Sequence, residues 1–275
     1  MGFKRSGASG IGLGITRYFI TQPDTHITIL DVNPMTATET LNSLRSEFSS
    51  SAVSFEQCDV SCWESQAVAF KKIYSQQGRI DIVFANAGIT EKGTLLPPGD
   101  SNQEPKKPDL STLNVNLLGA IYSVQLAIYY ISKNMTAISQ SDGSDLSSGL
   151  IVCNASIAAL CAFPISPIYA ASKSGLVGLV RSLARPLSAL QIRINAIAPS
   201  VIETNIAPSE DLYRSMILTP MSTAINAVAE FVSDESLTGK IAELHAEKFT
   251  FVEPPAYVDE DTRKNIEMFW SLGYA

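Results

Sequence analysis

The sequence predicts an α/β protein with a doubly wound, Rossmann-type sheet that is mostly parallel and flanked by helices. Short β-rich segments alternate with helix-like segments over nearly the whole chain, and a glycine-rich turn lies close to the N-terminus. The 275 residues, of which 45% are hydrophobic, suit one compact domain of this class over 1–275. Right-handed crossovers between parallel strands would place helices on both faces of the sheet.

Alternation of hydrophobic periods identifies the individual elements. Strands are expected at 26–30, 52–60, 81–88, 149–156 and 191–199. Helices are expected at 11–20, 35–48, 63–76, 110–133 and 167–187. Two stretches rich in Pro, Gly, Ser and Asp, 93–110 and 134–149, are expected to be surface loops. The C-terminal tail, 253–275, starts with prolines and ends on aromatic residues that we expect to dock on the body or on a partner subunit.

The glycine-rich turn SGASGIG occupies 6–12. Gly7 would form the tight bend, Gly10 would allow close approach of a pyrophosphate, and Gly12 would allow helix packing. The sequence therefore predicts a phosphate-binding turn that opens a helix.

The segment before this turn, MGFKR, does not resemble the buried apolar strand that normally precedes it. Lys4 and Arg5 stand where apolar side chains belong, and burying unpaired cations costs several kcal/mol each. The first strand is therefore expected to be short or missing. Three explanations stay open: a start truncated relative to the working protein, a degraded strand that still pairs through its backbone, and a protein that has lost tight cofactor binding.

Composition excludes several classes of partner. A formal net charge of −7 and a pI near 4.9 give no basic face for nucleic acid. No apolar run of the length of a membrane span and no secretory segment are found, so no membrane partner and a cytoplasmic location are expected. Four cysteines, Cys58, Cys62, Cys153 and Cys161, are expected to be reduced core thiols, and no metal site is expected.

A tyrosine and a lysine four residues apart form the strongest chemical pattern. Tyr169 and Lys173 lie one turn apart on the same face of a predicted helix. A nearby cation lowers the pKa of a tyrosine and makes the phenol a usable base. Ser156 ends the apolar strand LIVCNAS, at the carboxyl edge where open α/β sheets bind ligands, and can hold a substrate oxygen beside the tyrosine.

Over nearly its whole length the sequence resembles the short-chain dehydrogenase/reductase family. The matching elements follow the family's order: SGASGIG at 6–12, Asp31, Asp59 with Val60, Asn86 to Gly88, Asn116, Ser156, Tyr169 with Lys173, and Pro199 to Thr204. The C-terminal segment SLTGKIAELHAEKFTF is more similar to the 15-hydroxyprostaglandin dehydrogenase-like branch, including its fungal members. Secondary metabolism is the setting that this branch implies.

The resemblance implies a catalytic role for four residues. Tyr169 would be the acid/base, Lys173 would lower the tyrosine pKa and hold the nicotinamide ribose, and Ser156 would orient the substrate oxygen. Asn116 would support a water-mediated proton path.

The resemblance also implies the cofactor contacts: Gly7, Ser9, Gly10, Ile11, Gly12, Asp31, Asp59, Val60, Asn86, Ala87, Gly88, Tyr169, Lys173, Pro199, Ile202 and Thr204. Asp31 closes a predicted strand nineteen residues after Gly12, near the spacing of an acidic residue that binds the adenosine ribose. Its carboxylate would repel the 2′-phosphate of NADP, so NAD is preferred and NADP disfavoured. Ser200 stands where the family usually has glycine, which costs backbone freedom.

The sequence thus predicts an NAD-dependent oxidoreductase that interconverts a secondary alcohol and a ketone on an apolar small molecule. A homodimer or homotetramer is expected, joined through the helices that begin near 111 and 167, with Leu117, Ala120, Leu176 and Leu179 on their outer faces. The alternative is a cofactor-deficient or truncated family member that serves as an interaction module. The short N-terminal segment favours this alternative, and the intact Ser156, Tyr169 and Lys173 disfavour it.

Overall fold

The computed structural model describes residues 8–48, 52–96, 104–138, 149–204, 206 and 210–272. The strands are β1 (Ile27–Asp31), β2 (Val53–Gln57), β3 (Ile82–Ala85), β4 (Gly149–Asn154), β5 (Ile192–Pro199), β6 (Ile241–His245) and β7 (Lys248–Phe251). The helices are α1 (Gly10–Phe19), α2 (Pro34–Phe48), α3 (Trp63–Gln77), α4 (Ser111–Leu113), α5 (Gly119–Ile138), α6 (Pro167–Ser188), α7 (Met221–Ser233) and α8 (Glu260–Ser271). Short turns complete the list: the π-helical η1 (Asn114–Leu118) and the 3₁₀ segments η2 (Ile157–Ala159) and η3 (Glu210–Ser215).

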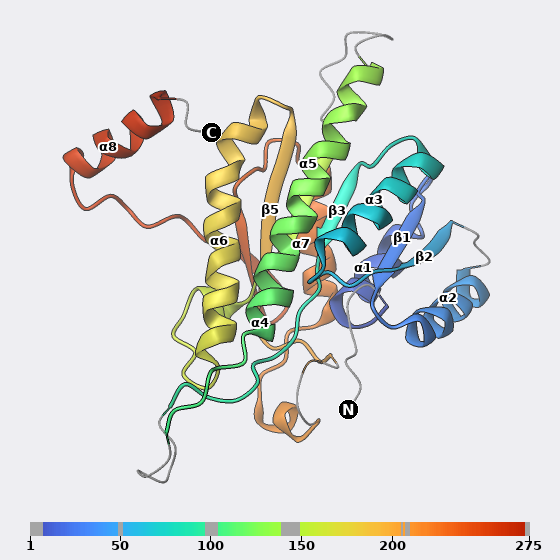
Figure 1. The fold of residues 1–275 in the computed structure, drawn as a ribbon, viewed down its shortest axis with the longest axis horizontal. Coiled ribbons are helices and arrows are strands. Elements are labelled where there is room, and N and C mark those ends of the chain that lie inside the picture. Colours follow the sequence, from blue (N-terminus) through green and yellow to red (C-terminus); the bar gives the residue numbers. More distant parts are fainter. Residues whose placement is uncertain are drawn as a thin grey trace.

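The predicted α/β architecture with a mostly parallel sheet is confirmed (Figure 1). Strands β3, β4, β5 and β6 are parallel neighbours in that order, and β7 pairs antiparallel with β6. All five predicted strands are found. Several elements differ from prediction: α5 continues to Ile138, where a loop was expected from 134, and neither helix α7 nor the β6–β7 hairpin was predicted.

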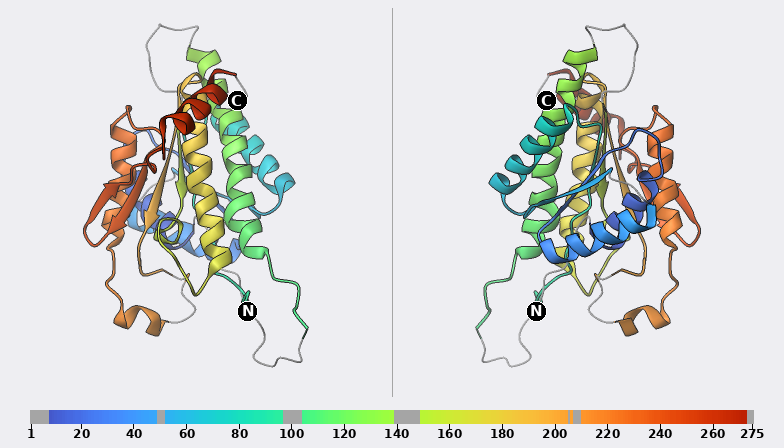
Figure 2. Two further views of the ribbon diagram at one scale, coloured as in Figure 1. Left: turned by 90° about the vertical axis from the view of Figure 1, so that its left-hand side faces the viewer. Right: turned by 90° about the vertical axis from the view of Figure 1, so that its right-hand side faces the viewer.

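Alternating side chains of β4 build the two halves of the core. Ile151 and Cys153 face α5 and α6 on one side of the sheet, whereas Leu150 and Val152 face α1 and α7 on the other. All four are almost fully buried, as expected of a parallel strand that is covered on both faces. Figures 1 and 2 show α5 and α6 side by side over one face and α7 over the opposite face.

Four residues predicted on outer helix faces do not lie there. Ala120 and Leu176 are buried in the core, and Leu117 and Leu179 pack partly buried against it. Leu117 contacts the helix α6 at Gly175, where a Cβ would lie 2.8 Å from the Leu117 side chain. The correction follows from packing, because α4 and η1 lie directly against α6 within one subunit.

The segment Ser111–Asn134 is long and apolar enough to span a membrane by length and composition, which the sequence analysis did not anticipate. Half of its most apolar stretch is buried inside the protein. Its inward side chains, including Val124, Ala127 and Ile131, belong to the main core. A core helix passes the same test, so the segment is explained by packing against the sheet.

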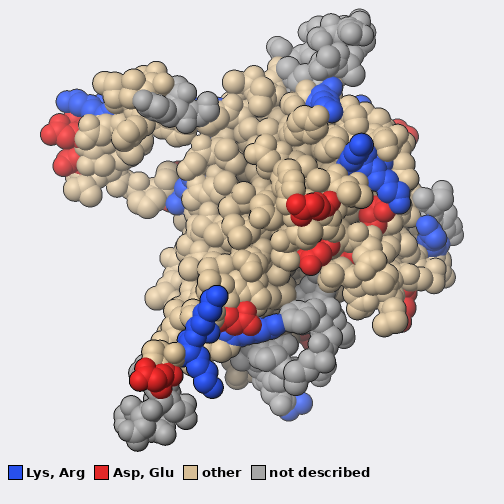
Figure 3. Space-filling model, in the orientation of Figure 1, with Lys and Arg blue, Asp and Glu red and all other residues tan. Residues whose placement is uncertain are grey.

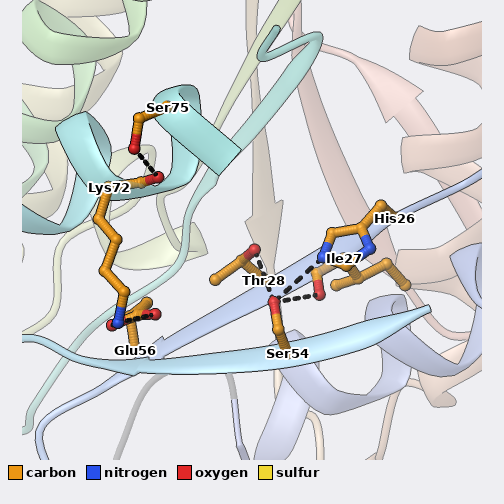
Figure 4. A network of polar contacts seen from close by, with 7 residues as sticks. All are labelled: His26, Ile27, Thr28, Ser54, Glu56, Lys72 and Ser75. Atoms are coloured by element: carbon orange, nitrogen blue, oxygen red, sulfur yellow. Dashed lines mark hydrogen bonds and ion pairs between the residues drawn. The ribbon is translucent and has the colours of Figure 1, made fainter. Parts of the chain in front are cut away.

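Strands β1 and β2 form a separate parallel pair. The Ser54 hydroxyl on β2 contacts the Thr28 hydroxyl at 2.9 Å and the His26 ring nitrogen at 3.2 Å on the β1 side (Figure 4). Lys72 of α3 forms an ion pair with Glu56 of β2 at 2.6 Å. These polar contacts connect β1 to β2 and connect β2 to α3.

Within the described part of the chain, no strand joins β1 to β3. A cavity of about 650 Å³ lies between them, lined by residues of both strands and by helices α1, α3 and α5. Its walls are largely apolar and include Ile15, Phe19, Ile29, Phe70 and Phe84. This agrees with the prediction of a short or missing first strand, and residues 1–7, including Gly7, lie outside the described residues.

The C-terminal tail carries α8, which projects away from the body (Figure 1). Asp259 caps it by accepting the Thr262 amide at 2.7 Å. Among the described residues, the expected docking is found at Trp270, whose ring lies 5.2 Å from the Arg185 guanidinium of α6, while Met268 and Phe269 are exposed. This contact holds the last turn of α8 beside α6 and leaves Met268 and Phe269 unburied.

We predict that the amides of β3 exchange with solvent at least about tenfold faster than those of β5, because β5 is paired on both sides whereas the described residues pair β3 only with β4. Hydrogen exchange followed by mass spectrometry measures both strands in one experiment. Equal protection of β3 and β5 would contradict an open edge beside the cavity.

Candidate active site

The carboxyl ends of β4 and β5 open into a hollow of about 110 Å³. The hollow brings together residues from five parts of the chain: Ser9, Gly10, Ile11, Asn86, Gly88, Asn154, Ala155, Ser156, Tyr169, Lys173, Pro199, Ser200, Ile202, Thr204 and Ile206. Most of the predicted site residues are in this list. The larger cavity between β1 and β3 holds none of the predicted catalytic side chains, so we place the candidate active site at the smaller hollow.

Helix α6 carries both Tyr169 and Lys173 on the face that meets the hollow. The Lys173 Nζ lies 5.6 Å from the centre of the Tyr169 ring. It donates a hydrogen bond of 2.6 Å to the carbonyl oxygen of Asn154, and the residue is only 2% exposed. The ammonium is thus held at the end of β4 by a backbone acceptor.

Burial shifts the two pKa values in opposite directions. The pKa of Lys173 is lowered to about 8 by desolvation, with a smaller opposing effect of Cys153. The pKa of Tyr169 is raised by desolvation, and its hydrogen bond with Ser156 opposes the rise. The predicted lowering of the tyrosine pKa by Lys173 is therefore not found, because desolvation of the phenol is the largest cause of the shift and the opposing effect comes from Ser156.

Ser156 lies at the predicted place, two residues beyond β4. Its hydroxyl caps η2 by accepting the Ala158 amide at 3.1 Å, and its side chain also bonds that of Tyr169. The neighbouring Asn154 donates from its amide to Asn86 Oδ1 at 2.8 Å, while its own side-chain oxygen is buried with no partner among the described residues. Such an unpaired oxygen is a free acceptor at the wall of the hollow.

Asn116 is fully buried in the π-helical turn η1. Its side-chain oxygen accepts the Ile89 amide at 2.8 Å, and its side-chain nitrogen donates to the Ile89 carbonyl at 2.9 Å and to the Ser172 hydroxyl at 3.2 Å. A Cβ placed on Gly88 would lie 3.5 Å from Lys173 Nζ and 3.6 Å from Asn116 Oδ1. Asn116 thus holds the loop after β3 close to the lysine, and π-turns of this kind are common at functional sites.

The glycine-rich turn opens α1 as predicted. Gly10 has φ of +56°, a left-handed conformation that favours glycine, and a Cβ there would lie 3.3 Å from the Thr204 side chain. Thr204 itself is held by Tyr213 of η3, whose hydroxyl accepts the Thr204 amide at 3.1 Å and donates to its carbonyl at 2.7 Å. The turn η3 is therefore hydrogen-bonded directly to a predicted cofactor contact.

Asp31 ends β1 and is almost fully buried. One carboxylate oxygen accepts the Ala8 amide at 3.4 Å and the other accepts the Asn33 amide at 3.0 Å. The side chain thus joins the glycine-rich turn to the end of β1, where a ribose-binding carboxylate was predicted.

The remaining predicted cofactor residues lie farther from the hollow. Asp59 is exposed, and its carboxylate accepts the amide and the hydroxyl of Ser61. Gly12, Val60 and Ala87 line the larger cavity, and Asn86 lines both. The structure therefore divides the predicted contacts between the two cavities.

The backbone at Ser200 shows no strain, contrary to the cost expected of a non-glycine residue. Only Asp24, Gln191 and Ala246 among the described non-glycine residues have positive φ. The Ser200 amide donates to the Leu244 carbonyl at 3.1 Å and so continues the pairing of β5 with β6. A serine is accommodated because the backbone at this position lies outside the left-handed region that favours glycine.

The cysteines are only partly as predicted. Cys58 and Cys153 are buried, and burial raises their pKa to about 11 and about 12 respectively. Cys62 is half-buried and Cys161 is exposed, so these two are not core thiols.

Comparison with known proteins identifies the family. A model described as short chain dehydrogenase matches residues 6–213. The chain belongs to the short-chain dehydrogenase family. As a family member it is an oxidoreductase with a Rossmann-type fold, as its sequence predicted.

Its relatives include fungal enzymes and a mammalian one. It is 31% identical over 252 residues to short-chain dehydrogenase/reductase ascJ of Acremonium egyptiacum, covering 90% of this chain and 78% of that protein. It is 31% identical to prx7 of Penicillium rubens, covering 72% of this chain and 67% of that protein. It is 28% identical to 15-hydroxyprostaglandin dehydrogenase [NAD(+)] of Rattus norvegicus, covering 88% of this chain and 89% of that protein. The predicted resemblance to this branch and its fungal members is confirmed.

Solved structures show the same fold. The NADP-bound structure of ElxO has a TM-score of 0.69 at 24% identity, covering 87% of this chain and 94% of that one. A short-chain type dehydrogenase/reductase from Mycobacterium ulcerans has a TM-score of 0.71 at 21% identity, covering 86% of this chain and 85% of that one.

Sequence reasoning missed Glu91 and Tyr213. Glu91 accepts hydrogen bonds from the first amides of α6, and Tyr213 is hydrogen-bonded to the backbone of Thr204. No local pattern marks either residue, because each acts on a segment that only the fold brings near. The run of polar residues after Gly88 was the one available hint for Glu91.

We predict that Lys173 makes stability depend on pH between about 8 and 10.5. In this window the unfolded lysine keeps its proton and the buried one has released it, so the unfolded chain binds more protons and the free energy of unfolding rises with pH, by up to about 3 kcal/mol. Urea unfolding of the protein and of Lys173→Met at pH 7.5 and 10 measures the effect. The variant should lack this rise, and parallel pH dependences of the two proteins would contradict the prediction.

Proposed function

We propose that this oxidoreductase interconverts a secondary alcohol and a ketone on an apolar small molecule, with NAD as its preferred cofactor. The observation that carries the proposal is the convergence of Ser156, Tyr169 and Lys173 on one hollow at the carboxyl edge of the sheet. A phenol, a hydroxyl and an ammonium within one small site suit proton transfer at a substrate oxygen.

The residues around the hollow fit a nicotinamide dinucleotide. Gly10 has the left-handed backbone that a close phosphate approach needs, and the open helix N-terminus of α1 favours an anion. Gly88 leaves the space beside Lys173 free of a side chain, and the unpaired Asn154 oxygen offers an acceptor. Bound there, the nicotinamide would supply the hydride acceptor or donor.

The protein's own side chains would manage the proton. In oxidation, Tyr169 Oη takes the hydroxyl proton of the alcohol as the carbon–oxygen double bond forms and the carbinol hydride leaves. In reduction, the same hydroxyl returns the proton to the ketone oxygen. Ser156 orients this oxygen through a hydrogen bond, and Lys173 places positive charge beside the phenol.

Preference for NAD rests on Asp31. Its buried carboxylate sits beside the glycine-rich turn at the end of β1, where negative charge disfavours a 2′-phosphate. The similar rat enzyme is named for NAD(+), whereas ElxO, which shares the fold, has been solved with NADP bound. The carboxylate in this chain supports the first of these cofactors.

An apolar substrate is favoured by the segments beside the hollow. Ile202 and Ile206 line it. The loop after β3 and the segment after η3 expose further apolar side chains: Leu95, Leu96, Met216, Ile217 and Leu218. Similarity to 5′-hydroxyaverantin dehydrogenase stcG of Emericella nidulans, 29% identical with coverage of 86% of this chain and 81% of that protein, supports an alcohol substrate and a role in secondary metabolism.

Assembly as a homodimer or homotetramer is part of the proposal. Figure 3 shows that the surface over α6 and the adjoining part of α5 carries few charges. Leu118 and Tyr129 of this region are exposed, at 40% and 52%. A second copy packed against this face would bury them.

The alternative function, an interaction module without bound cofactor, is favoured by one observation. Among the described residues, the cavity between β1 and β3 separates the pair β1–β2 from the other five strands beside the glycine-rich turn. Cofactor binding therefore separates the two functions, and the titration below measures it.

We predict that Tyr169→Phe abolishes turnover of secondary alcohols and ketones and leaves cofactor binding nearly unchanged, because only the proton-transferring hydroxyl is removed. Steady-state kinetics and calorimetric titration of the same samples measure the two effects. Phe163→Leu, which alters the ring beside Tyr169 at 6.3 Å without touching the hydroxyl, is the matched control. Unchanged turnover in Tyr169→Phe would remove Tyr169 from the mechanism.

We predict that the protein binds NADH more tightly than NADPH and that Asp31→Ala narrows this difference by about tenfold, because the carboxylate no longer repels the 2′-phosphate. Calorimetric titration of both proteins with each nucleotide gives the ratio. An unaltered ratio would show that Asp31 does not select the cofactor, and a folded protein that binds neither nucleotide would favour the interaction module.

A further inference from the structure

Helix α6 lacks a cap of its own at the end that carries Tyr169. An α-helix leaves its first four amides without partners inside the helix, and a side chain at the N-cap usually satisfies one of them. Ser166 holds the N-cap position but makes no side-chain cap hydrogen bond. Pro167 follows and has no amide hydrogen, so the amides of Ile168 and Tyr169 need an acceptor from elsewhere.

Glu91 supplies this acceptor from the loop after β3. Its Oε2 accepts the Ile168 amide at 2.7 Å and the Tyr169 amide at 3.0 Å, across 77 and 78 positions of sequence. A carboxylate is favoured there because the helix dipole places partial positive charge at the N-terminus. The other oxygen, Oε1, is buried with no hydrogen-bond partner among the described residues.

The loop that carries Glu91 is itself held on three sides. Asn116 bonds both backbone groups of Ile89, as described above, and the Thr112 hydroxyl donates to the Thr90 carbonyl at 3.2 Å. Residues 89, 90 and 91 are thus bonded to η1, α4 and α6 in turn. Glu91 is fixed before it reaches α6, so it can impose a position on the start of that helix.

We propose that Glu91 is a positioning residue for Tyr169: it fixes the first turn of α6 relative to the loop after β3 and places negative charge beside the tyrosine backbone. The inference rests on the proposed function, since it assumes that Tyr169 transfers the proton. The carboxylate contacts the backbone amide of the tyrosine, and in this proposal its negative charge opposes ionisation of the phenol on the same residue. Its effect on the reaction passes through Tyr169 and needs no contact with substrate.

Two variants separate the positioning of the first turn of α6 from the effect of the negative charge. Glu91→Gln keeps a side-chain oxygen for the amides of Ile168 and Tyr169 and removes the charge, whereas Glu91→Ala removes both. Asp259 offers the matched control, because its carboxylate accepts the Thr262 amide at 2.7 Å at the start of α8, a helix that carries none of the predicted site residues. Asp259→Asn keeps the acceptor oxygen and removes the charge, and Asp259→Ala removes both.

We expect Glu91→Ala to lower kcat by about tenfold or more while the dissociation constant for NADH stays within about twofold, because misplacing a catalytic group impairs the reaction more than binding. Glu91→Gln should keep most of kcat and move the limb of the pH profile that reports Tyr169 to lower pH. The Asp259 variants should change neither kcat nor the pH profile. A folded Glu91→Ala with wild-type kcat and pH profile, or with lowered thermal stability alone, would overturn the inference.

A readout without turnover keeps this test separate from the test of function. The absorbance of ionised tyrosine, recorded against pH for the protein and for Glu91→Gln, each with the Tyr169→Phe background subtracted, reports the ionisation of Tyr169 directly. Ionisation at lower pH in Glu91→Gln would support the inference even if no substrate is turned over. Identical titration curves would overturn it, whatever the activity.

Discussion

The parallel pairing of β4 with β5 is the constraint on which the site depends. The register runs from Gly149 opposite Ile192 to Asn154 opposite Ile197, and the Ala155 amide extends it by one further bond of 2.8 Å to the Ile197 carbonyl. Side chains on both faces of β4 are buried, so a slip by one residue would exchange the two halves of the core. The register therefore fixes where the strand ends, with the Asn154 carbonyl facing Lys173.

Helix α6 completes the arrangement because it is positioned at both of its ends and along its length. It packs on β5 through Leu176, Val177 and Val180. Lys173 fixes one of its turns to β4, and Glu91 fixes its first turn to the loop after β3. The tyrosine lies between these two attachments, which gives the phenol a defined place without a hydrogen bond from any distant side chain except Ser156.

The sequence was informative wherever function follows local pattern. The strand runs and the spacing of Tyr169 and Lys173 depend on nearest neighbours along the chain, and the family order of the motifs located Ser156 and Asn116. The β6–β7 hairpin was missed because its strands have five and four residues and its turn places Ala246, rather than glycine, at φ of +47°. Glu91 was missed because its partners lie 77 and 78 residues away.

The tyrosine pKa was mispredicted for a related reason. The spacing of Tyr169 and Lys173 correctly placed a cation near a phenol, but the sign of a pKa shift depends on how much water the fold removes from each group. Burial of α6 against the sheet desolvates both side chains, and this desolvation is the largest cause of both pKa shifts. The spacing of two residues along a helix shows that their side chains are close, but it does not show how far the fold shields them from water.

The opposite shifts of Tyr169 and Lys173 bear on how one site can serve both directions of a redox reaction. Burial favours the neutral phenol, which is the form that donates a proton to a ketone oxygen. Removing a proton from an alcohol needs the phenolate instead. Beside oxidised nicotinamide, Tyr169 would meet a second positive charge besides Lys173, which favours the phenolate, and beside the reduced form it would meet Lys173 alone. A phenol that burial keeps neutral, and whose ionisation the charge of the oxidised cofactor favours, would therefore match its protonation state to the direction of hydride transfer.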